Sequence, residues 1–141
     1  MIVPETVKAD KRKLVYLASV YSWPYDQTVD SKVKEKRFRT AAKCAAKIHL
    51  KGVYNVFSPI AHSHPIQKYG KLPFDHNWYA DDLDILRLCD ELWIIDTEGW
   101  NKSIGVRKEI ELAQELKMRI RLVTPRGRDY KYKEVSHESI D

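Results

Sequence analysis

Two carboxylates, Glu109 and Asp82, stand at positions where the sequence pattern otherwise places apolar side chains. Glu109 precedes Leu112, Ala113 and Leu116 by three, four and seven residues, which is the spacing of a single helix face. Asp82 has the same spacing to three apolar residues that follow it in its own segment. A carboxylate on a core-facing helix stripe must be paired, lie near solvent or serve a function.

The two carboxylates together suit a reaction that needs one nucleophile and one acid. Retaining glycoside cleavage is such a reaction. The drier carboxyl of such a pair keeps its proton and donates it, whereas the hydrogen-bonded one stays ionised. Either residue alone is also explained by a helix-terminal charge or a buried salt bridge. Two of them on successive helices favour the functional interpretation.

Tyr16, Ser103 and Gly105 are further candidates for a binding site. Tyr16 lies in an apolar run, where it is either a core aromatic or a hydroxyl that contacts a catalytic carboxylate. Ser103 and Gly105 flank an expected helix N-terminus, whose free N–H groups favour phosphate or another anion. Ser103 also suits the plain role of N-cap for that helix.

Two histidines and two tryptophans complete the list of candidates. His62 and His64 form a His-x-His pair, but no further metal ligands accompany it, so we expect structural or substrate-contacting histidines and no metal or cofactor. Trp78 and Trp100 suit stacking on a nucleobase or ordinary packing.

The elements that must position these residues alternate between strand and helix. Strands are predicted at 14–19, 53–57, 92–96 and 119–124. Helices are predicted at 28–51, from Asp75 or Asn77 onward, and at 103–117. The segment 58–75, which holds three prolines, is predicted to be a long loop, and the residues from Pro125 onward a charged tail.

This alternation predicts one α/β domain over residues 1–141, with its core at about 14–124 and the tail at 125–141. We expect a flavodoxin- or Rossmann-like, mostly parallel sheet of four to five strands with helices on both faces. Ligands of such sheets lie outside the carboxyl ends of the strands, here near the loops 19–27, 58–75 and 97–103.

The composition is that of a globular protein, with 43% hydrophobic and 32% charged residues. The chain has no apolar run of the roughly 20 residues that span a bilayer and no apolar centre of a signal peptide near its start. Two cysteines without metal spacing fit a reduced, cytoplasmic setting.

The basic segment 32–51 fits a solvated helix face, a surface for polyanions or a means of steering an anionic substrate. Nucleic-acid binding is not expected, because aromatic residues are not interleaved with the basic ones.

Three motifs in the same order along the chain resemble the nucleoside 2-deoxyribosyltransferase superfamily, which includes the 2′-deoxynucleoside 5′-monophosphate N-glycosidases. They are Tyr16-Leu-Ala-Ser19, Asp82-Leu followed by Asp90, and Ser103-x-Gly-x-x-x-Glu109, within residues 14 to 124. The segment 56–65 and the pair Gly99-Trp100 look more like one bacterial and phage branch of that superfamily, a domain family of unknown function.

The resemblance implies a role for each matching residue. Glu109 would attack the anomeric carbon and form a glycosyl-enzyme, Asp82 would act as the acid for the departing base, and Tyr16 would orient the nucleophile. Ser103 would recognise the 5′ end of the sugar, where serine suits a phosphate and the transferases' carboxylate suits a free hydroxyl. With the residues considered above, the predicted substrate-binding set is Ser19, Ser103, Gly105, His62, His64 and Trp100.

The resemblance therefore implies a cytoplasmic, bacterial or phage-encoded enzyme that cleaves the N-glycosidic bond of a nucleoside or nucleoside 5′-monophosphate. Water or another base would accept the sugar, without a cofactor. A homodimer or larger homo-oligomer is expected, and no membrane partner. Two alternatives stay open, a non-catalytic nucleotide-binding domain that uses the same pocket and a polyanion-binding protein that uses the basic helix.

Overall fold

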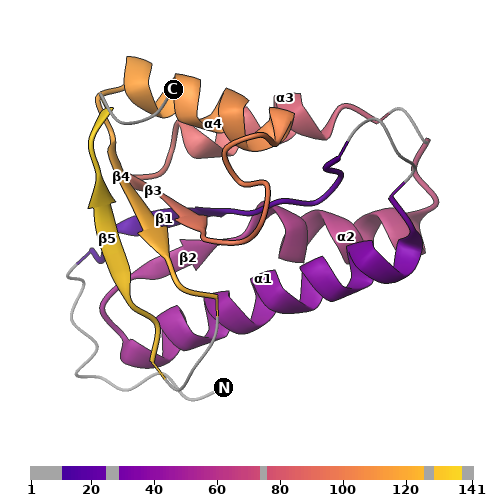
Figure 1. Cartoon of the computed structure of the whole chain (residues 1–141), viewed down its shortest axis with the longest axis horizontal. Helices are drawn as coiled ribbons and strands as arrows, with labels where there is room; N and C mark the ends of the chain where they lie inside the picture. Colours follow the sequence, from indigo (N-terminus) through magenta and orange to yellow (C-terminus); the bar gives the residue numbers. More distant parts are fainter. Residues whose placement is uncertain (1–10, 25–28, 74–75, 126–128, 138–141) are drawn as a thin grey trace.

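The computed structural model describes residues 11–24, 29–73, 76–125 and 129–137. These residues form a five-stranded sheet with helices on both faces (Figure 1). The strands are β1 (Leu14–Ala18), β2 (Asn55–Phe57), β3 (Glu91–Ile95), β4 (Arg119–Val123) and β5 (Tyr132–Val135). The helices are α1 (Ser31–Lys51), α2 (Pro59–Gly70), α3 (Trp78–Leu86) and α4 (Ile104–Glu115). The predicted α/β domain with a mostly parallel sheet is confirmed.

The strand order is β2-β1-β3-β4-β5, and only β5 runs antiparallel to its neighbour. The chain passes from β1 outward to β2 and then crosses back to β3 on the other side of β1. The direction of winding therefore reverses between β1 and β3. In open α/β sheets, ligands bind outside the carboxyl ends of the strands at such a reversal.

Helices α1 and α2 cover one face of the sheet, and α3 and α4 cover the other (Figure 1). Alternation along β1 sends Val15 and Leu17 toward the α1/α2 face and Tyr16 and Ala18 toward the α3/α4 face. All four side chains are fully buried, as a central parallel strand requires. Tyr16 therefore faces the pair of helices that carries the two candidate carboxylates.

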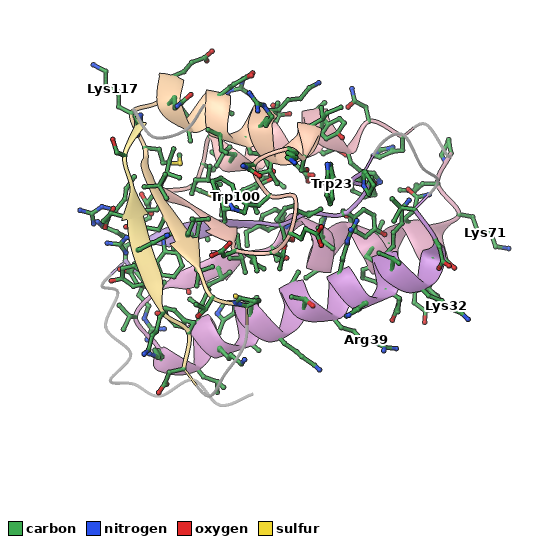
Figure 2. The ribbon with its side chains drawn as sticks, viewed as in Figure 1. Trp23, Lys32, Arg39, Lys71, Trp100 and Lys117 are labelled. Atoms are coloured by element: carbon green, nitrogen blue, oxygen red, sulfur yellow. The ribbon has the colours of Figure 1, made fainter. Side chains whose placement is uncertain are left out.

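Helix α1 has suitable caps at both ends. Asp30 accepts a hydrogen bond from the first turn, and Gly52 ends the helix with a left-handed φ of 69°. The predicted start at Thr28 lies outside the described residues. The side chains of Lys32 and Arg39 point away from the body of the molecule, so this part of the basic segment forms an outer helix face (Figure 2). No helix among the described residues is long and apolar enough to cross a membrane.

The prediction of a loop across 58–75 is wrong, because most of this segment is helix α2. Ser58 caps the helix by accepting a backbone N–H over 3.2 Å, and Pro59 occupies the first turn, where its missing N–H does no harm. Pro65 inside the helix removes one backbone bond, at a typical cost of about 3 kcal/mol. Packing offsets that cost, since α2 lies against α1 and β1 and Ile60 is buried in the core.

The helices that carry the carboxylates begin close to the predicted positions. Asn77 caps α3 by accepting a backbone N–H over 3.1 Å, while the alternative start at Asp75 lies outside the described residues. Ser103 caps α4. Leu116 is the C-cap of α4 and is 46% exposed, so its predicted place on the buried stripe is wrong. The helix ends at Glu115, one residue before Leu116.

Part of the predicted charged tail from Pro125 onward forms the strand β5, which the prediction did not include. This strand adds an antiparallel edge to β4, with Tyr132 opposite Val123. The charged residues of β5 suit an exposed edge, and Glu134 pairs with a buried arginine of β4, Arg121. The final residues of the predicted tail, 138–141, lie outside the described residues.

Candidate active site

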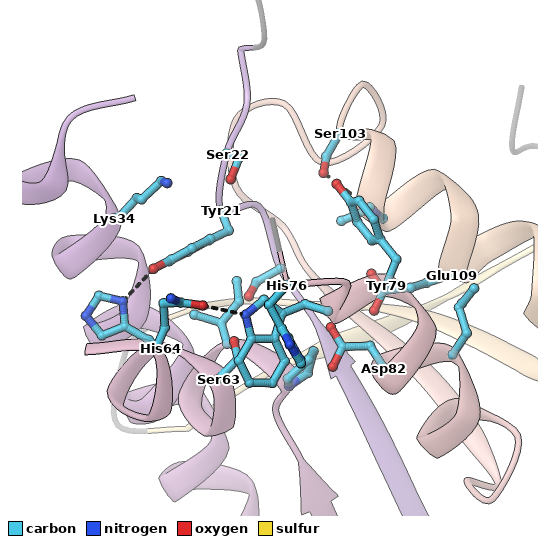
Figure 3. A pocket seen from close by; sticks show the side chains of 18 residues that line it. Tyr21, Ser22, Lys34, Ser63, His64, His76, Tyr79, Asp82, Ser103 and Glu109 are labelled. Carbon is cyan, nitrogen blue, oxygen red and sulfur yellow. Dashed lines mark hydrogen bonds between the residues drawn. The ribbon is translucent and has the colours of Figure 1, made fainter. Parts of the chain in front are cut away.

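A pocket of about 420 Å³ lies at the reversal of the strand order, beside the segment that follows β1. Residues of that segment and of all four helices line it. Figure 3 shows the labelled side chains of α1 and α2 on one side, namely Lys34, Ser63 and His64, and those of α3 and α4 on the other, namely Tyr79, Asp82 and Glu109. Of the three loops predicted near the ligand, the segment 97–103 contributes only Ser103 to the lining.

The structure brings the two predicted carboxylates together at one end of the pocket. Asp82 from α3 and Glu109 from α4 both line it (Figure 3). Glu109 lies on the buried face of its helix and is only 8% exposed. Asp82 is half-buried, and its Oδ1 atom has no hydrogen-bond partner among the described residues. Neither carboxylate makes an ion pair with a described residue that would account for its burial.

Burial raises the pKa of both carboxyl groups. The pKa of Glu109 is raised to about 8, chiefly by burial; interaction with the Tyr16 hydroxyl opposes this rise, and the charge of Asp82 adds to it. The pKa of Asp82 is raised to about 6 by burial and by the neighbouring charge of Asp81. At neutral pH the pair therefore holds one proton, and in the ligand-free protein Glu109 carries it.

Tyr16 lies next to the carboxylate pair, although it is not part of the pocket lining. Burial, followed by the charges of Glu109 and Asp82, raises the pKa of its hydroxyl. This hydroxyl is close enough to influence the pKa of Glu109, yet no hydrogen bond of good geometry joins them or reaches any other described residue. The Ser19 hydroxyl and Asp82 Oδ1 are likewise buried without a partner in the described part of the chain. Such a cluster of unsatisfied polar atoms is typical of a ligand site.

Ser103 and Gly105 line the pocket at the N-terminus of α4. The Ser103 Oγ atom accepts the Val106 N–H over 3.4 Å, so the serine does act as an N-cap. The Tyr79 ring of α3 lies against this turn, because a Cβ on Gly105 would come within 3.0 Å of the ring atom Cε1. The hydroxyls of Ser103 and Tyr79 point toward one another (Figure 3). This end of α4 thus presents hydroxyl groups beside the positive end of a helix dipole.

A chain of hydrogen bonds forms part of the opposite wall. The His64 ring joins the Tyr21 hydroxyl through Nδ1 over 2.6 Å and the Glu35 carboxylate through Nε2 over 2.7 Å. The ring also stacks on Phe38, with centroids 4.5 Å apart. The Lys34 Nζ atom lies 5.3 Å from the centroid of the Tyr21 ring. The hydrogen bond from His64 lowers the pKa of Glu35.

The loop that carries Tyr21 is held from two sides. The Arg37 guanidinium of α1 donates to the carbonyl oxygens of Tyr21 and Trp23, each over 2.7 Å. The Trp23 ring packs on Gly99, which has a φ of 86° and whose added Cβ would lie 2.4 Å from the ring. A glycine is therefore required beneath this tryptophan. The loop brings Tyr21 to the pocket in a defined position.

Trp78 forms an aromatic part of the pocket wall at the start of α3. Its Nε1–H donates to Gln67 Oε1 over 2.9 Å, and Gln67 Nε2 donates to the Leu72 carbonyl over 2.9 Å. His76 meets the Trp78 ring edge-on, with centroids 4.6 Å apart. These contacts fix the orientation of the indole ring.

A family model matches residues 13–124, which include every residue that lines the pocket. The chain belongs to DUF1937, a domain family of unknown function. No curated protein matches the chain significantly. The DUF1937 match ends before β5, so the edge strand lies outside the part that the family model describes.

Two of the predicted binding residues lie outside the pocket of this DUF1937 domain. His62 is exposed, with its ring 5.5 Å from that of Phe57, and Trp100 packs against the core of the α3/α4 face. Their contact with a ligand stays a prediction. Within the described ranges, no group of three or more His, Cys, Asp or Glu side chains could hold a metal ion.

Several lining residues of the DUF1937 pocket were not singled out from the sequence, namely Tyr21, Lys34, Ser63, His76 and Tyr79. Five residues of α2 line the pocket at helical spacing, at positions 59, 60, 63, 64 and 67. That spacing would have been visible in the sequence had the segment been assigned to a helix.

Proposed function

We propose that this domain cleaves the N-glycosidic bond of a nucleoside 5′-monophosphate or nucleoside. The observation that carries the proposal is the meeting of two carboxylates of raised pKa, from adjacent helices, in one pocket beside a buried tyrosine hydroxyl. A pair that holds one proton can supply a nucleophile and an acid at once. The resemblance of the motifs around Tyr16, Asp82 and Glu109 to the nucleoside 2-deoxyribosyltransferase superfamily suggests the bond that they act on.

In the proposed reaction Glu109 is the nucleophile and Asp82 the acid. Because the resting proton is on Glu109, it first passes to Asp82, and the Tyr16 hydroxyl stabilises the carboxylate that remains. A Glu109 oxygen then bonds to C1′ while the C1′–N bond breaks, and Asp82 gives its proton to the departing base. Water or another base next attacks C1′, Asp82 takes up the proton that is released, and Glu109 leaves as a carboxylate. The positive charge that develops on the sugar favours the ionised glutamate.

The N-terminus of α4 is the proposed site for the 5′ end of the substrate. Backbone N–H groups and the helix dipole favour a phosphate there, and the side chains of Ser103 and Tyr79 add hydroxyl donors. The absence of a carboxylate at position 103 avoids repulsion of a phosphate. A 5′-monophosphate is therefore the preferred form of the substrate.

A panel of nucleosides and their 5′-monophosphates, incubated with and without acceptor bases, tests the proposal. Mass spectrometry should detect free base together with sugar phosphate, or an exchanged nucleotide when an acceptor is present. A glycosyl group trapped on the enzyme should map to the peptide that contains Glu109. Trapping on Asp82 would reverse the two roles, as the resting proton on Glu109 would allow. Binding of monophosphates without any base release would instead identify a nucleotide-binding domain.

The rate of base release should show a bell-shaped dependence on pH. The proposed reaction needs a single proton on the carboxylate pair. Below a pH of about 6 both groups are protonated and no nucleophile is present, whereas above about 8 both are ionised and no acid is present. We expect kcat/KM for the preferred substrate to be highest near pH 7 and to fall about ten-fold per pH unit on each side. A profile that stays flat from pH 5 to 9 would contradict the shared proton.

A further inference from the structure

The α1/α2 side of the pocket ends in the hydrogen-bonded chain of Tyr21, His64 and Glu35, and the direction of its hydrogen bonds can be worked out. The bond from His64 keeps the pKa of Glu35 low, so this carboxylate is ionised and can only accept. His64 Nε2 must therefore carry a proton. In the neutral imidazole with that tautomer Nδ1 is an acceptor, and the Tyr21 O–H then donates to it over 2.6 Å.

This direction decides what Tyr21 offers to a ligand. Its only proton is used by His64, so the phenol oxygen presents lone pairs to the pocket and acts as an acceptor. Burial and the charge of Glu35 raise the pKa of Tyr21, so the phenol keeps that proton. Lys34 stands beside the same ring, and its ammonium can only donate. Among the described residues Lys34 makes no ion pair, and its side chain lines the pocket.

The pocket wall formed by Lys34, Tyr21 and His64 lies where the proposed substrate would place its base. Figure 3 shows Lys34, Tyr21 and His64 on the side of the pocket away from Glu109 and Ser103. With the anomeric carbon at Glu109 and the 5′ end at Ser103, the base has the space toward α1 and α2. The indole of Trp78 lines the same pocket in a fixed orientation and suits a planar ring.

We infer that this wall selects nucleobases in which a carbonyl stands next to a ring N–H, as in uracil, thymine, hypoxanthine and guanine. Lys34 donates to the carbonyl oxygen, and the Tyr21 oxygen accepts the ring N–H. Cytosine and adenine present the opposite pattern, an amino donor beside a ring nitrogen that only accepts. Glu35 and His64 are positioning residues, because they fix the polarity of Tyr21. The inference rests on the proposed function for the identity of the ligand.

Two pairs of nearly isosteric ligands test the selection. dUMP and dCMP differ at one edge of the pyrimidine, and dIMP and dAMP differ at one edge of the purine. Titration calorimetry on the Glu109→Gln variant measures their binding without turnover. We expect dUMP to bind about ten-fold more tightly than dCMP, and dIMP about ten-fold more tightly than dAMP. Equal affinities, or a preference for dCMP and dAMP, would overturn the inference.

Variants of the wall residues test whether the hydrogen-bond direction of Tyr21 selects the base or whether these residues only support the pocket. Tyr21→Phe removes the acceptor. Glu35→Gln introduces a carboxamide that can either donate to or accept from His64, so both tautomers of the His64 ring become possible. Both changes should bring the ratio of dCMP to dUMP dissociation constants to within about two-fold of unity. Arg39→Gln is the matched control, because Arg39 pairs with Glu35 over 3.6 Å on the outer side of α1 and should leave the ratio unchanged. Variants that weaken both ligands equally and keep the ratio would show support alone and refute the inference.

Failure of the inference can be told apart from failure of the proposed function. Base release by the unmodified protein is measured separately from binding. Release without discrimination between the paired ligands would overturn only the inference. Discrimination without release from any ligand would overturn the proposed reaction and support the assignment of the wall as a base-reading site.

Discussion

Replacing Glu109 by glutamine should lower the rate of base release at least about a thousand-fold, which corresponds to about 4 kcal/mol in the activation barrier. The variant keeps the shape of the side chain and its place on the buried face of α4, but it cannot form an ester with C1′. No glycosyl-enzyme should therefore appear in the intact mass. The measurement is single-turnover release of base from the preferred monophosphate at pH 7.

Glu111 provides the matched control on the same helix. It lies two residues further along α4 with an exposed side chain, outside the pocket lining. Glu111→Gln should release base at the unmodified rate and show the same intact-mass adduct. Full activity of Glu109→Gln would remove the residue from the mechanism. Equal losses in both variants would point to a general effect on α4.

The same substitution should make the folded protein more stable at alkaline pH. The pKa of Glu109 is about 8 in the folded protein, above its ordinary value of 4.5, so the folded state holds its proton more tightly than the unfolded chain does. This contribution to stability is complete below pH 4.5 and is lost as pH rises through 8. Glutamine never ionises, so at pH 9 the variant should exceed the unmodified protein by on the order of a few kcal/mol in free energy of unfolding. At pH 4 the difference should vanish, as urea titrations can show.

The carboxylate end of the pocket could be predicted from the sequence because a helix face is a local pattern. Glu109 and Asp82 each stand in register with apolar residues one and two turns away, and that register defines the side of the helix that meets the core. The order of strands and helices then places both helices on one face of the sheet. Tyr16 follows from the alternation along β1, which sends it to the same face.

The α1/α2 end of the pocket could not be predicted, because its contacts join distant segments. His64 is 43 residues from Tyr21 and 29 from Glu35, and no local pattern links the three. The prolines also favoured a loop where the chain forms α2. The local rule that proline interrupts a helix was outweighed by tertiary packing, including the stack of His64 on Phe38.

The edge strand β5 escaped prediction for a related reason. Charged and aromatic residues alternate over 129–133, and three of the five are charged, so the pattern predicts a charged tail. The strand is held by pairing with β4 and by the stacking of the Arg121 guanidinium 4.1 Å above the Tyr132 ring. Arg121 inside the strand predicted at 119–124 was itself a signal, since a buried cation requires partners from elsewhere in the chain.

Replacing Arg121 by methionine should destabilise the fold by about 3–5 kcal/mol, because it removes the main partner of a buried acid. Arg121 lies 3.4 Å from Glu91, which is 2% exposed, and it also donates to Glu134 over 2.8 Å and to the Tyr54 hydroxyl over 3.1 Å. Although burial opposes its charge, these hydrogen bonds and the two carboxylates raise the pKa of Arg121, so the guanidinium stays charged. Methionine would leave Glu91 with the Trp93 N–H at 3.0 Å and only the largely exposed lysine at position 13 as a cation, at 3.6 Å.

Arg119 offers the control for this prediction, since it pairs with the same Glu134 over 3.5 Å from an exposed position on the same strand. Arg119→Met should cost less than about 1 kcal/mol, as is usual for a surface ion pair. Urea unfolding of both variants measures the difference, and the double variant Arg121→Met with Glu91→Gln should recover a large part of the loss, because no buried charge is then left alone. Equal, small effects of the two arginine substitutions would show that the buried network contributes no more than its surface neighbour.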